Sequence, residues 1–308
     1  MSTATAPVRP VSRLRTYATF VRFEHTLFTL PLILAGVFSV VGPALSLGRW
    51  LLIVVAAVGA RTTAMTLNRL IDRRLDALNP RTRVRELPSG RMKLAEAWAL
   101  LAGAMSAYLV TCWALDPAGL LYLKVAAIPL VVFSGYPYAK RFTPFCHFGV
   151  GSGMALAPLA GYLAAHPELA QPWPALWLGA FTLFWGSGFD IIYSTLDEES
   201  DRANGIKSMV VWLGRKRALR VSALLHVLAF ASAVIAGLAA ATSSVLSSPT
   251  ATLSLAGVGM MLLPLTVAGV LLFLEQRWAE NVNLAFFKVN VWVSFFVLLM
   301  ILGSHYRG

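Results

Sequence analysis

An amide and two carboxylates recur at four-residue intervals where a long apolar run of the sequence ends. They are Asn68, Asp72 and Asp76 in the stretch NRLIDRRLD. Residues four apart lie on the same face of a helix, so this spacing predicts a row of three oxygen-bearing side chains. Amide and carboxylate oxygens are the hard ligands that Mg²⁺ takes, usually together with water and substrate phosphates.

A second acidic cluster has the same spacing. In DIIYSTLDEESD, Asp197 and Asp201 are four residues apart, and Asp190 precedes Asp197 by seven. We expect these three carboxylates to share one helical face as well. Carboxylates at a membrane boundary are costly unless they are paired or bind a ligand. Two regular clusters therefore favour a metal site over the alternative, a set of solvated loop charges in surface ion pairs.

Cationic side chains that could bind phosphate surround both clusters. They are Arg69, Arg73, Arg74, Lys140, Arg141, Arg202 and Lys207. Acids and bases mixed in this way predict a diphosphate that is held through metal ions.

The composition indicates a membrane protein. Hydrophobic residues make up 57% of the 308 residues and charged residues only 13%, about half of the usual share in a soluble domain. The net charge of +12 would suit a nucleic-acid binder, but the basic residues lie in short gaps between apolar runs. That distribution is typical of membrane topology, so the lipid bilayer is the expected partner and nucleic acid is not.

Nine apolar runs are long enough for membrane helices, which need about 20 residues each. Their approximate limits are 26–44, 49–69, 95–114, 119–138, 147–165, 174–194, 218–240, 252–274 and 286–303. We expect an all-α, polytopic membrane protein in which residues 1–308 form one integral membrane domain and residues 1–22 a cytoplasmic N-terminal segment.

The basic residues also predict the orientation. With a cytoplasmic N-terminus, 22 of the 26 Lys and Arg residues fall on the inner side. Only Arg49, Lys124 and Arg307 fall on the outer side, and Arg61 lies within the second run. This positive-inside pattern predicts an outer C-terminus and places both acidic clusters at the cytoplasmic face. A cleaved signal peptide is the alternative for the N-terminus, but the long apolar run without a small-residue cleavage site favours a retained first span.

Three segments resemble motifs of the UbiA superfamily of intramembrane prenyltransferases. NRLIDRRLDALNPRTRVRELPSG resembles the first motif, N-x-x-x-D-x-x-x-D, and DIIYSTLDEESDRANGIKS resembles the second, D-x-x-x-D. YPYAK at 136–140 is similar to the tyrosine–lysine motif, and FEHTLFTLPL at 23–32 is similar to bacterial polyprenyltransferases of quinone synthesis. The resemblance covers residues 23–213. It implies a bundle of nine transmembrane helices with a cytoplasmic-side cap over a central cavity.

The resemblance also implies roles for individual side chains. The implied metal ligands are Asn68, Asp72, Asp197 and Asp201, with Asp76 as a weaker candidate. The implied diphosphate-binding residues are Tyr136 and Lys140, with Arg69, Arg141 and Lys207 as helpers or, equally, as structural loop anchors.

The activity implied by the resemblance is Mg²⁺-dependent transfer of a polyprenyl group from polyprenyl diphosphate to an aromatic carboxylic acid. The acceptor would be 4-hydroxybenzoate or a dihydroxynaphthoate, in ubiquinone or menaquinone synthesis at a bacterial inner membrane. Alternatives within the enzyme class are a haem or chlorophyll precursor as acceptor, or a terpene cyclase. A membrane transporter is the alternative from another class, since intramembrane charges also mark transporters.

Two charged residues are expected inside the membrane. Arg61 precedes Asn68 by seven residues, which places it about 10 Å deeper at 1.5 Å per residue. Asp190 precedes Asp197 by the same interval. One interpretation is a structural pair of Arg61 with Asp190. The other is catalytic: Arg61 recognises the acceptor carboxylate, and Asp190 polarises its hydroxyl or takes the ring proton. Tyr193 would take part as the neighbour of Asp190 and Asp197 on the helix face.

Four further residues are expected to have structural roles. Glu24 and His25 open the first span, where an interfacial hydrogen-bonding role is favoured over catalysis. Cys112 and Cys146 fall near opposite ends of their spans, so we expect two separate thiols.

Overall fold

The protein is helical throughout the part of the chain that the structure describes. The computed structural model describes residues 12–23, 26–41, 45–247, 255–279 and 285–306, and no strand occurs in these ranges. The helices in chain order are α1 (Arg13–Phe20), α2 (Thr26–Val37), α3 (Leu47–Leu78), α4 (Leu94–Leu115), α5 (Leu121–Val125), α6 (Ala127–Phe142), the 3₁₀ helix η2 (Pro144–Cys146), α7 (His147–Ala165), α8 (Trp173–Ser194), α9 (Glu198–Ala203), α10 (Met209–Leu213), α11 (Arg215–Leu246), α12 (Leu255–Arg277) and α13 (Ala285–Ser304). The expected all-α fold is confirmed.

Seven helical segments within the described ranges are long and apolar enough to cross a membrane. They are Leu47–Leu78, Leu94–Leu115, Leu121–Phe142, Pro144–Ala165, Trp173–Ser194, Arg215–Leu246 and Leu255–Arg277. The chain is therefore an integral membrane protein. The first and last of the nine expected spans are not among the seven, because helix is described only over Thr26–Val37 in the first and the apolar stretch of the last is Val289–Ser304. Residues 42–44 and 252–254, at the ends of two expected spans, lie outside the described residues.

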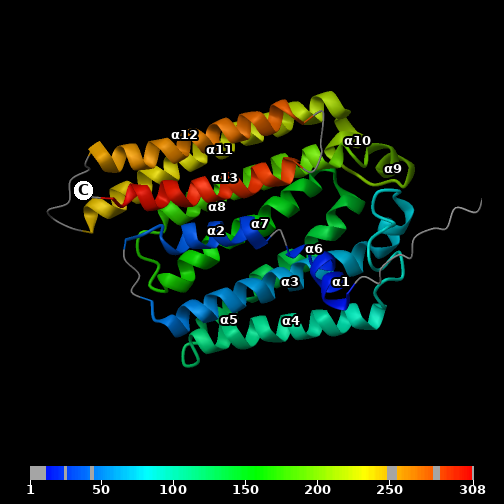
Figure 1. Cartoon of the computed structure of the whole chain (residues 1–308), viewed down its shortest axis with the longest axis horizontal. Helices are drawn as coiled ribbons and strands as arrows, with labels where there is room; N and C mark the ends of the chain where they lie inside the picture. The colour runs from blue at the N-terminus through cyan, green and yellow to red at the C-terminus, as the bar shows by residue number, and fades with distance from the viewer. Residues whose placement is uncertain (1–11, 24–25, 42–44, 248–254, 280–284, 307–308) are drawn as a thin grey trace, which may run out of the picture.

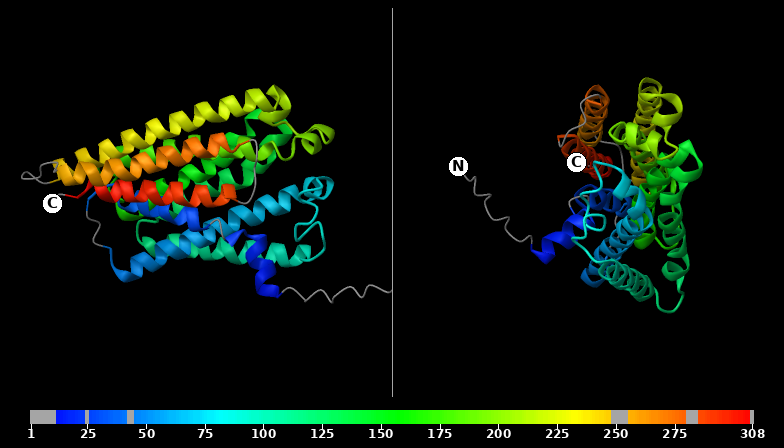
Figure 2. Two further views of the ribbon diagram at one scale, coloured as in Figure 1. Left: turned by 45° about the horizontal axis from the view of Figure 1, so that its top comes forward. Right: turned by 90° about the vertical axis from the view of Figure 1, so that its right-hand side faces the viewer.

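The long helices lie side by side, with α11, α12 and α13 in one group and α3 and α4 in another (Figures 1 and 2). The main hydrophobic core joins α2 and α8 to the first group, through buried residues such as Leu32, Trp185, Met261 and Val293. Alanines on α11 contribute small side chains to this core, which lets neighbouring helix backbones approach closely.

Glycines bring α7 close to α2 on one side and to α8 on the other. A Cβ atom on Gly36 of α2 would lie 1.9 Å from the carbonyl oxygen of Pro158 on α7. A Cβ atom on Gly151 of α7 would lie 2.3 Å from the carbonyl oxygen of Leu183 on α8. Only glycine fits at such contacts, so these residues fix how close the helix pairs lie.

The first acidic cluster lies on one long helix. The Ser46 hydroxyl accepts a hydrogen bond from the Arg49 backbone N–H and caps the start of α3. The 32 residues of α3 span about 48 Å at 1.5 Å per residue, which exceeds the hydrocarbon thickness of about 30 Å. The helix continues past Asp76 and is capped at Asn79, so the predicted row of three side chains is continuous.

The second acidic cluster is interrupted by a helix break. Helix α8 ends at Ser194, and α9 begins at Glu198. The hydroxyls of Ser194 and Thr195 donate to the carbonyls of Ile191 and Ile192 at 2.8 and 2.7 Å, and such bonds compete with helix continuation. The expectation that Asp190, Asp197 and Asp201 share one helical face is therefore wrong.

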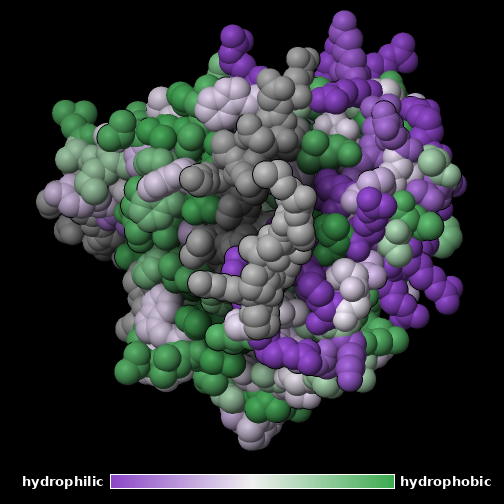
Figure 3. All heavy atoms as spheres, turned by 45° about the vertical axis from the view of Figure 1, so that its right-hand side comes forward, coloured by the Kyte–Doolittle hydropathy of each residue, from purple (hydrophilic) through white to green (hydrophobic). Residues whose placement is uncertain are grey.

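Both clusters nevertheless meet at one end of the bundle. The segment after α3 and the short helices α9 and α10 lie together there (Figure 1), because Asn79 and Arg81 both hydrogen-bond Asp197. Figure 3 shows hydrophilic side chains gathered on one side of the molecule, with mainly hydrophobic ones on the other. Cys112 and Cys146 are separate free thiols, as expected.

Candidate active site

A large cavity extends between helices α2 to α8. Its volume is about 1350 Å³, and its lining on α3 extends from Ile53 to Arg69, about 24 Å at 1.5 Å per residue. Small side chains leave this space open, among them Ala60 and Ala64 on α3 and Ala157 on α7. The cavity is long and its lining is mostly apolar, which suits an extended apolar ligand.

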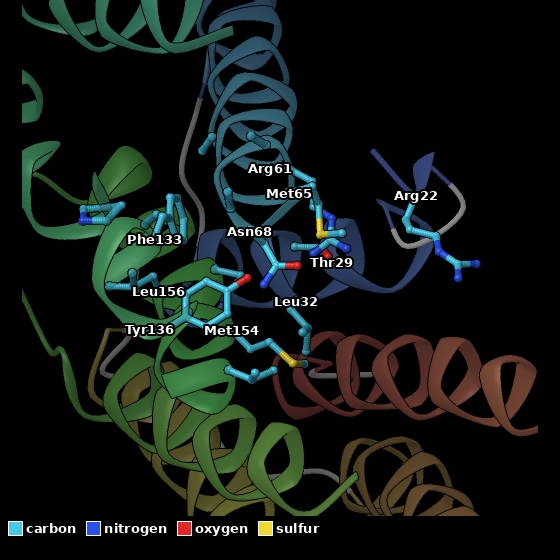
Figure 4. A pocket seen from close by; sticks show the side chains of 18 of the residues that line it. Arg22, Thr29, Leu32, Arg61, Met65, Asn68, Phe133, Tyr136, Met154 and Leu156 are labelled. Carbon is cyan, nitrogen blue, oxygen red and sulfur yellow. The ribbon is translucent and has the colours of Figure 1, made fainter. Parts of the chain in front are cut away.

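The polar groups of this cavity gather toward one end. Figure 4 shows Arg61, Met65 and Asn68 along α3, with Tyr136 of α6 opposite them. A second cavity of about 170 Å³ shares Asn68, Lys140 and other lining residues with the first. Its lining includes side chains from both acidic clusters whose oxygens can bind a metal ion: Asn68, Asp72, Asp76, Asp197 and Asp201.

Asp72 is the buried centre of the first cluster. It is 2% exposed, and its Oδ2 accepts hydrogen bonds from the Asn68 amide at 3.2 Å and from Lys140 Nζ at 2.6 Å. Arg141 Nη2 donates to Asp72 Oδ1 at 3.4 Å and to the Ile71 carbonyl at 3.1 Å. The tyrosine–lysine segment on α6 therefore brings cations directly to the acidic face of α3.

Asp76, one turn further along α3, has a different partner. Arg85 Nη1 donates to its Oδ1 at 2.7 Å, and the Thr82 hydroxyl donates to its backbone carbonyl at 3.0 Å. These bonds tie the segment after α3 back onto the helix. Asp76 remains a lining residue of the smaller cavity, but it also anchors this segment.

Asp197 of the second cluster faces the same segment. Its carboxylate accepts from the Asn79 amide at 2.7 Å and from Arg81 at 2.8 and 2.5 Å. Burial alone would raise the pKa of Asp197, but the hydrogen bonds and charge of Arg81 and the Asn79 amide outweigh it and hold the pKa below its usual value. The Asp197 carboxylate is therefore held in its ionised form beside Arg81.

Asp201 on α9 is more easily protonated. Burial, followed by the negative charge of Asp197, raises the pKa of Asp201 to about 6. A divalent ion bound between Asp197 and Asp201 would remove this repulsion, since it adds positive charge where two carboxylates meet.

The donor set fits Mg²⁺. Among the described residues, no three His, Cys, Asp or Glu side chains are close enough together to hold a metal ion by themselves. Mg²⁺ does not need such a cage, because it usually takes one or two carboxylates and completes its shell with water and substrate phosphates. Asn68 with Asp72, and Asp197 with Asp201, supply hard oxygens of that kind around one cavity.

Three of the expected phosphate helpers have other partners. Arg69 Nε donates to the carbonyl of Phe20 on α1 at 3.3 Å, although the residue also lines the large cavity. Lys207 Nζ donates to the Phe142 carbonyl at 3.3 Å. Arg141 engages Asp72 and stacks over the Tyr138 ring at 5.0 Å. Arg69 and Arg141 thus keep contact with the cavity or with Asp72, and both alternatives for these three residues stay predictions.

Arg61, Asp190 and Tyr193 all line the large cavity. Asp190 pairs with His147, whose Nδ1 lies 2.6 Å from Asp190 Oδ2. Arg61 and Asp190 both line the cavity, and the choice between their structural and catalytic roles stays a prediction. Glu24 and His25 lie outside the described residues.

Several residues of the site were missed in the sequence. Arg81 and Arg85 lie on the segment after α3, and the dense run RTRVRE was the available signal. Arg22 lines the large cavity from the turn after α1. A single histidine before an apolar run, such as His147, gives no signal from spacing.

Comparisons with known proteins agree with this geometry. A profile of the UbiA prenyltransferase family matches residues 29–292. A 4-hydroxybenzoate octaprenyltransferase of Shewanella denitrificans is 30% identical over 237 residues, covering 75% of this chain and 78% of that protein. The apo structure of a UbiA homologue from Aeropyrum pernix K1 is 28% identical with a TM-score of 0.74, covering 89% of this chain and 95% of the other.

A more distant structure shows the same fold. It is a UbiA homologue from Archaeoglobus fulgidus bound to GPP and Mg²⁺, with 18% identity and a TM-score of 0.62 over 94% of this chain and 99% of the other. The chain is thus an intramembrane prenyltransferase by class. It belongs to the UbiA prenyltransferase family. The expected family and enzyme class are confirmed, and the transporter alternative is dropped.

Proposed function

We propose that the chain transfers a polyprenyl group from a polyprenyl diphosphate to an aromatic carboxylic acid, with Mg²⁺ as cofactor. The acceptor is 4-hydroxybenzoate or a dihydroxynaphthoate, and the product belongs to ubiquinone or menaquinone synthesis. The observation that carries the proposal is the division of the cavity into a charged end and a long apolar body. Relatives named 4-hydroxybenzoate octaprenyltransferase support the acceptor class.

The charged end is assigned to the diphosphate. Asn68 and Asp72 on one side and Asp197 and Asp201 on the other would hold Mg²⁺, with Asp76 as a weaker candidate. When bound, Mg²⁺ neutralises the charge that develops on the diphosphate as its bond to carbon breaks. Lys140 and Arg81 line the same space and would transfer their hydrogen bonds from carboxylates to diphosphate oxygens. Tyr136 lines the adjoining wall, where its hydroxyl can donate to the same group.

The apolar body is assigned to the prenyl chain. Its walls run from the charged end toward the opposite end of α3, among residues such as Ala60, Ile53 and Leu163. Such walls exclude water, which would otherwise capture an allylic cation. They also bury the long hydrocarbon chain away from water, which is energetically favourable.

The acceptor is assigned to the junction between the two parts. Arg61 would bind its carboxylate, because a guanidinium fork matches the two oxygens of that group. A ring carbon forms the new bond to C1 of the prenyl chain as the C1–oxygen bond breaks, and the diphosphate leaves with the electron pair. Asp190, with Tyr193 nearby on α8, takes up the proton that the ring carbon loses.

We also propose nine membrane spans with a cytoplasmic N-terminus and an outer C-terminus, in the inner membrane of a bacterium. The seven helical segments that are long and apolar enough to cross a membrane, together with helices α2 and α13, support this count. The basic residues support the orientation. The segments 79–93 and 195–214 would then form a cytoplasmic cap on a single domain of residues 1–308.

Product analysis tests the proposal directly. Purified protein is given Mg²⁺, prenyl diphosphates of several lengths and both aromatic acids, and the products are identified by mass. We expect a prenylated aromatic acid that depends on Mg²⁺. A cyclic hydrocarbon made without an acceptor would instead indicate a cyclase, and activity only on a porphyrin precursor would overturn the acceptor assignment.

Arg61→Lys tests the acceptor site. The variant keeps the charge but loses the planar fork, so KM for the aromatic acid should rise about tenfold while diphosphate binding stays unchanged. A parallel change in both constants, or no change in either, would show that Arg61 does not bind the acceptor.

A further inference from the structure

His147, which belongs to none of the sequence motifs, is hydrogen-bonded at both ring nitrogens. It is the first residue of α7 and is 2% exposed. The Met209 backbone N–H donates to its Nε2 at 3.2 Å, and its Nδ1 lies 2.6 Å from Asp190 Oδ2. A backbone N–H can only donate, so Nε2 accepts and Nδ1 carries the proton. In this arrangement a neutral imidazole donates its Nδ1–H to the Asp190 carboxylate.

Close helix packing fixes the distance between these two side chains. Gly151 lies one turn after His147 on α7, and Gly186 lies one turn before Asp190 on α8. A Cβ atom on Gly186 would come within 3.1 Å of the Gly151 Cα atom, so the two backbones touch at this level. The pair therefore depends on rigid helices and not on a loop.

The other side of His147 is fixed to the segment that carries the second acidic cluster. The Ile206 N–H donates to the Asp201 carbonyl at 2.9 Å, and the Lys207 N–H donates to the Lys140 carbonyl at 2.8 Å. Two residues later, Met209 donates to His147. The backbone segment 206–209 thus connects the candidate metal loop to His147, and His147 connects it to Asp190.

Asp190 remains accessible from the cavity. Its side chain is 31% exposed and lines the large cavity, while one of its oxygens is engaged by His147. A carboxylate side chain on an apolar wall can occupy several rotamers unless a hydrogen-bond partner fixes one of them.

We propose that His147 is a positioning residue that orients the Asp190 carboxylate toward the aromatic acceptor and fixes it relative to the diphosphate-binding loop. This assignment rests on the proposed function, in which Asp190 receives the ring proton. Residues that orient a metal ligand through a hydrogen bond typically contribute about 10–100-fold to metal affinity or activity, and we expect a similar contribution from a residue that orients Asp190.

Three variants test this role. His147→Leu removes both hydrogen bonds at similar volume. In His147→Gln, the amide NH₂ can donate to Asp190 and the amide oxygen can accept from Met209, so both bonds are replaced. His166→Leu is the matched control, because it alters a buried histidine at the other end of α7, far from Asp190.

We expect His147→Leu to lower kcat about 10–100-fold, with KM for the prenyl diphosphate within about twofold. His147→Gln should recover most of the loss, and His166→Leu should keep the wild-type kcat. If His147 acts through Asp190, adding His147→Leu to Asp190→Asn should cause no further loss of kcat.

Wild-type kcat in His147→Leu would overturn the assignment, and so would a double variant whose two losses multiply. Equal loss in His147→Leu and His147→Gln with unchanged melting temperature would also overturn it. If His147→Leu does not fold, the comparison of His147→Gln with the shorter His147→Asn, which cannot reach both partners, decides the question. Wild-type protein that makes no prenylated aromatic acid at all would refute the proposed function, and this role with it.

Discussion

The two acidic clusters have the same spacing in the sequence but different settings in the fold. Asn68, Asp72 and Asp76 lie on one uninterrupted helix, and Asp72 is held by cations from a neighbouring helix. Asp197 and Asp201 follow a helix break. Helix geometry thus positions the side chains of the first cluster, whereas side-chain hydrogen bonds position Asp197 of the second.

The segment after α3 explains how such different rows face one cavity. Asn79 and Arg81 donate to Asp197, while Arg85 donates to Asp76. A single short segment therefore contacts both clusters. Substitutions in the first cluster should therefore lower both the stability of the bundle and ligand binding, whereas substitutions in the second should lower mainly ligand binding.

Asp72→Asn should have the largest effect. Loss of a carboxylate that binds Mg²⁺ should lower kcat/KM about 10³-fold or more. The variant should also lose about 1–3 kcal/mol of unfolding free energy, since it leaves Lys140 without its charged partner at a buried site. Activity and thermal unfolding of purified protein measure both, with exposed Glu199→Gln as control. Full activity would remove Asp72 from the metal site.

Asp197→Asn should lower activity without lowering stability. We expect a loss of about 10²-fold in kcat/KM, but a melting temperature close to that of the wild type. The reason is solvent screening, because the side chains of Arg81 and Asp197 are 39% and 15% exposed. A stability loss as large as that of Asp72→Asn would contradict the distinction between the two clusters.

Arg81→Ala should have a moderate effect on ligand binding. Removing a guanidinium that can bind diphosphate oxygens should raise KM for the prenyl diphosphate about tenfold and change kcat little. Steady-state kinetics measure both constants. Arg83→Ala, an exposed arginine two residues further on, serves as the control. Equal effects of the two substitutions would mean that only general positive charge matters.

Lower pH should weaken Mg²⁺ binding slightly at the second cluster. The folded pKa of Asp201 is raised to about 6, and only the deprotonated carboxylate binds the ion. Affinity should therefore be complete above the pKa and fall as the pH drops through it, by about fourfold at pH 5.5 relative to pH 7.5. Calorimetric Mg²⁺ titrations of the intact protein in the presence of inorganic diphosphate measure this. A constant affinity over that range would show that Asp201 is not a ligand.

The sequence predicted the fold class and one of the two rows well. Apolar runs and basic gaps predict helices and membrane insertion, and a four-residue spacing is sufficient to align Asn68, Asp72 and Asp76 on α3. The break after Ser194 was missed because two hydroxyls bond back to the helix carbonyls, which periodicity does not reveal. The dense basic run RTRVRE marks Arg81 and Arg85 as candidates but does not identify their partners. The Arg81–Asp197 and His147–Asp190 pairs join segments far apart in the chain, so spacing carries no signal for them.

A structure of the protein with Mg²⁺ and an unreactive prenyl diphosphate analogue tests the central claim most directly. We predict Mg²⁺ bound to one diphosphate from both sides, with oxygens of the Asn68–Asp72 row and of the Asp197–Asp201 row at about 2.1 Å from the metal. Ions ligated by one row alone, with the other still in its ion pairs, would contradict the account.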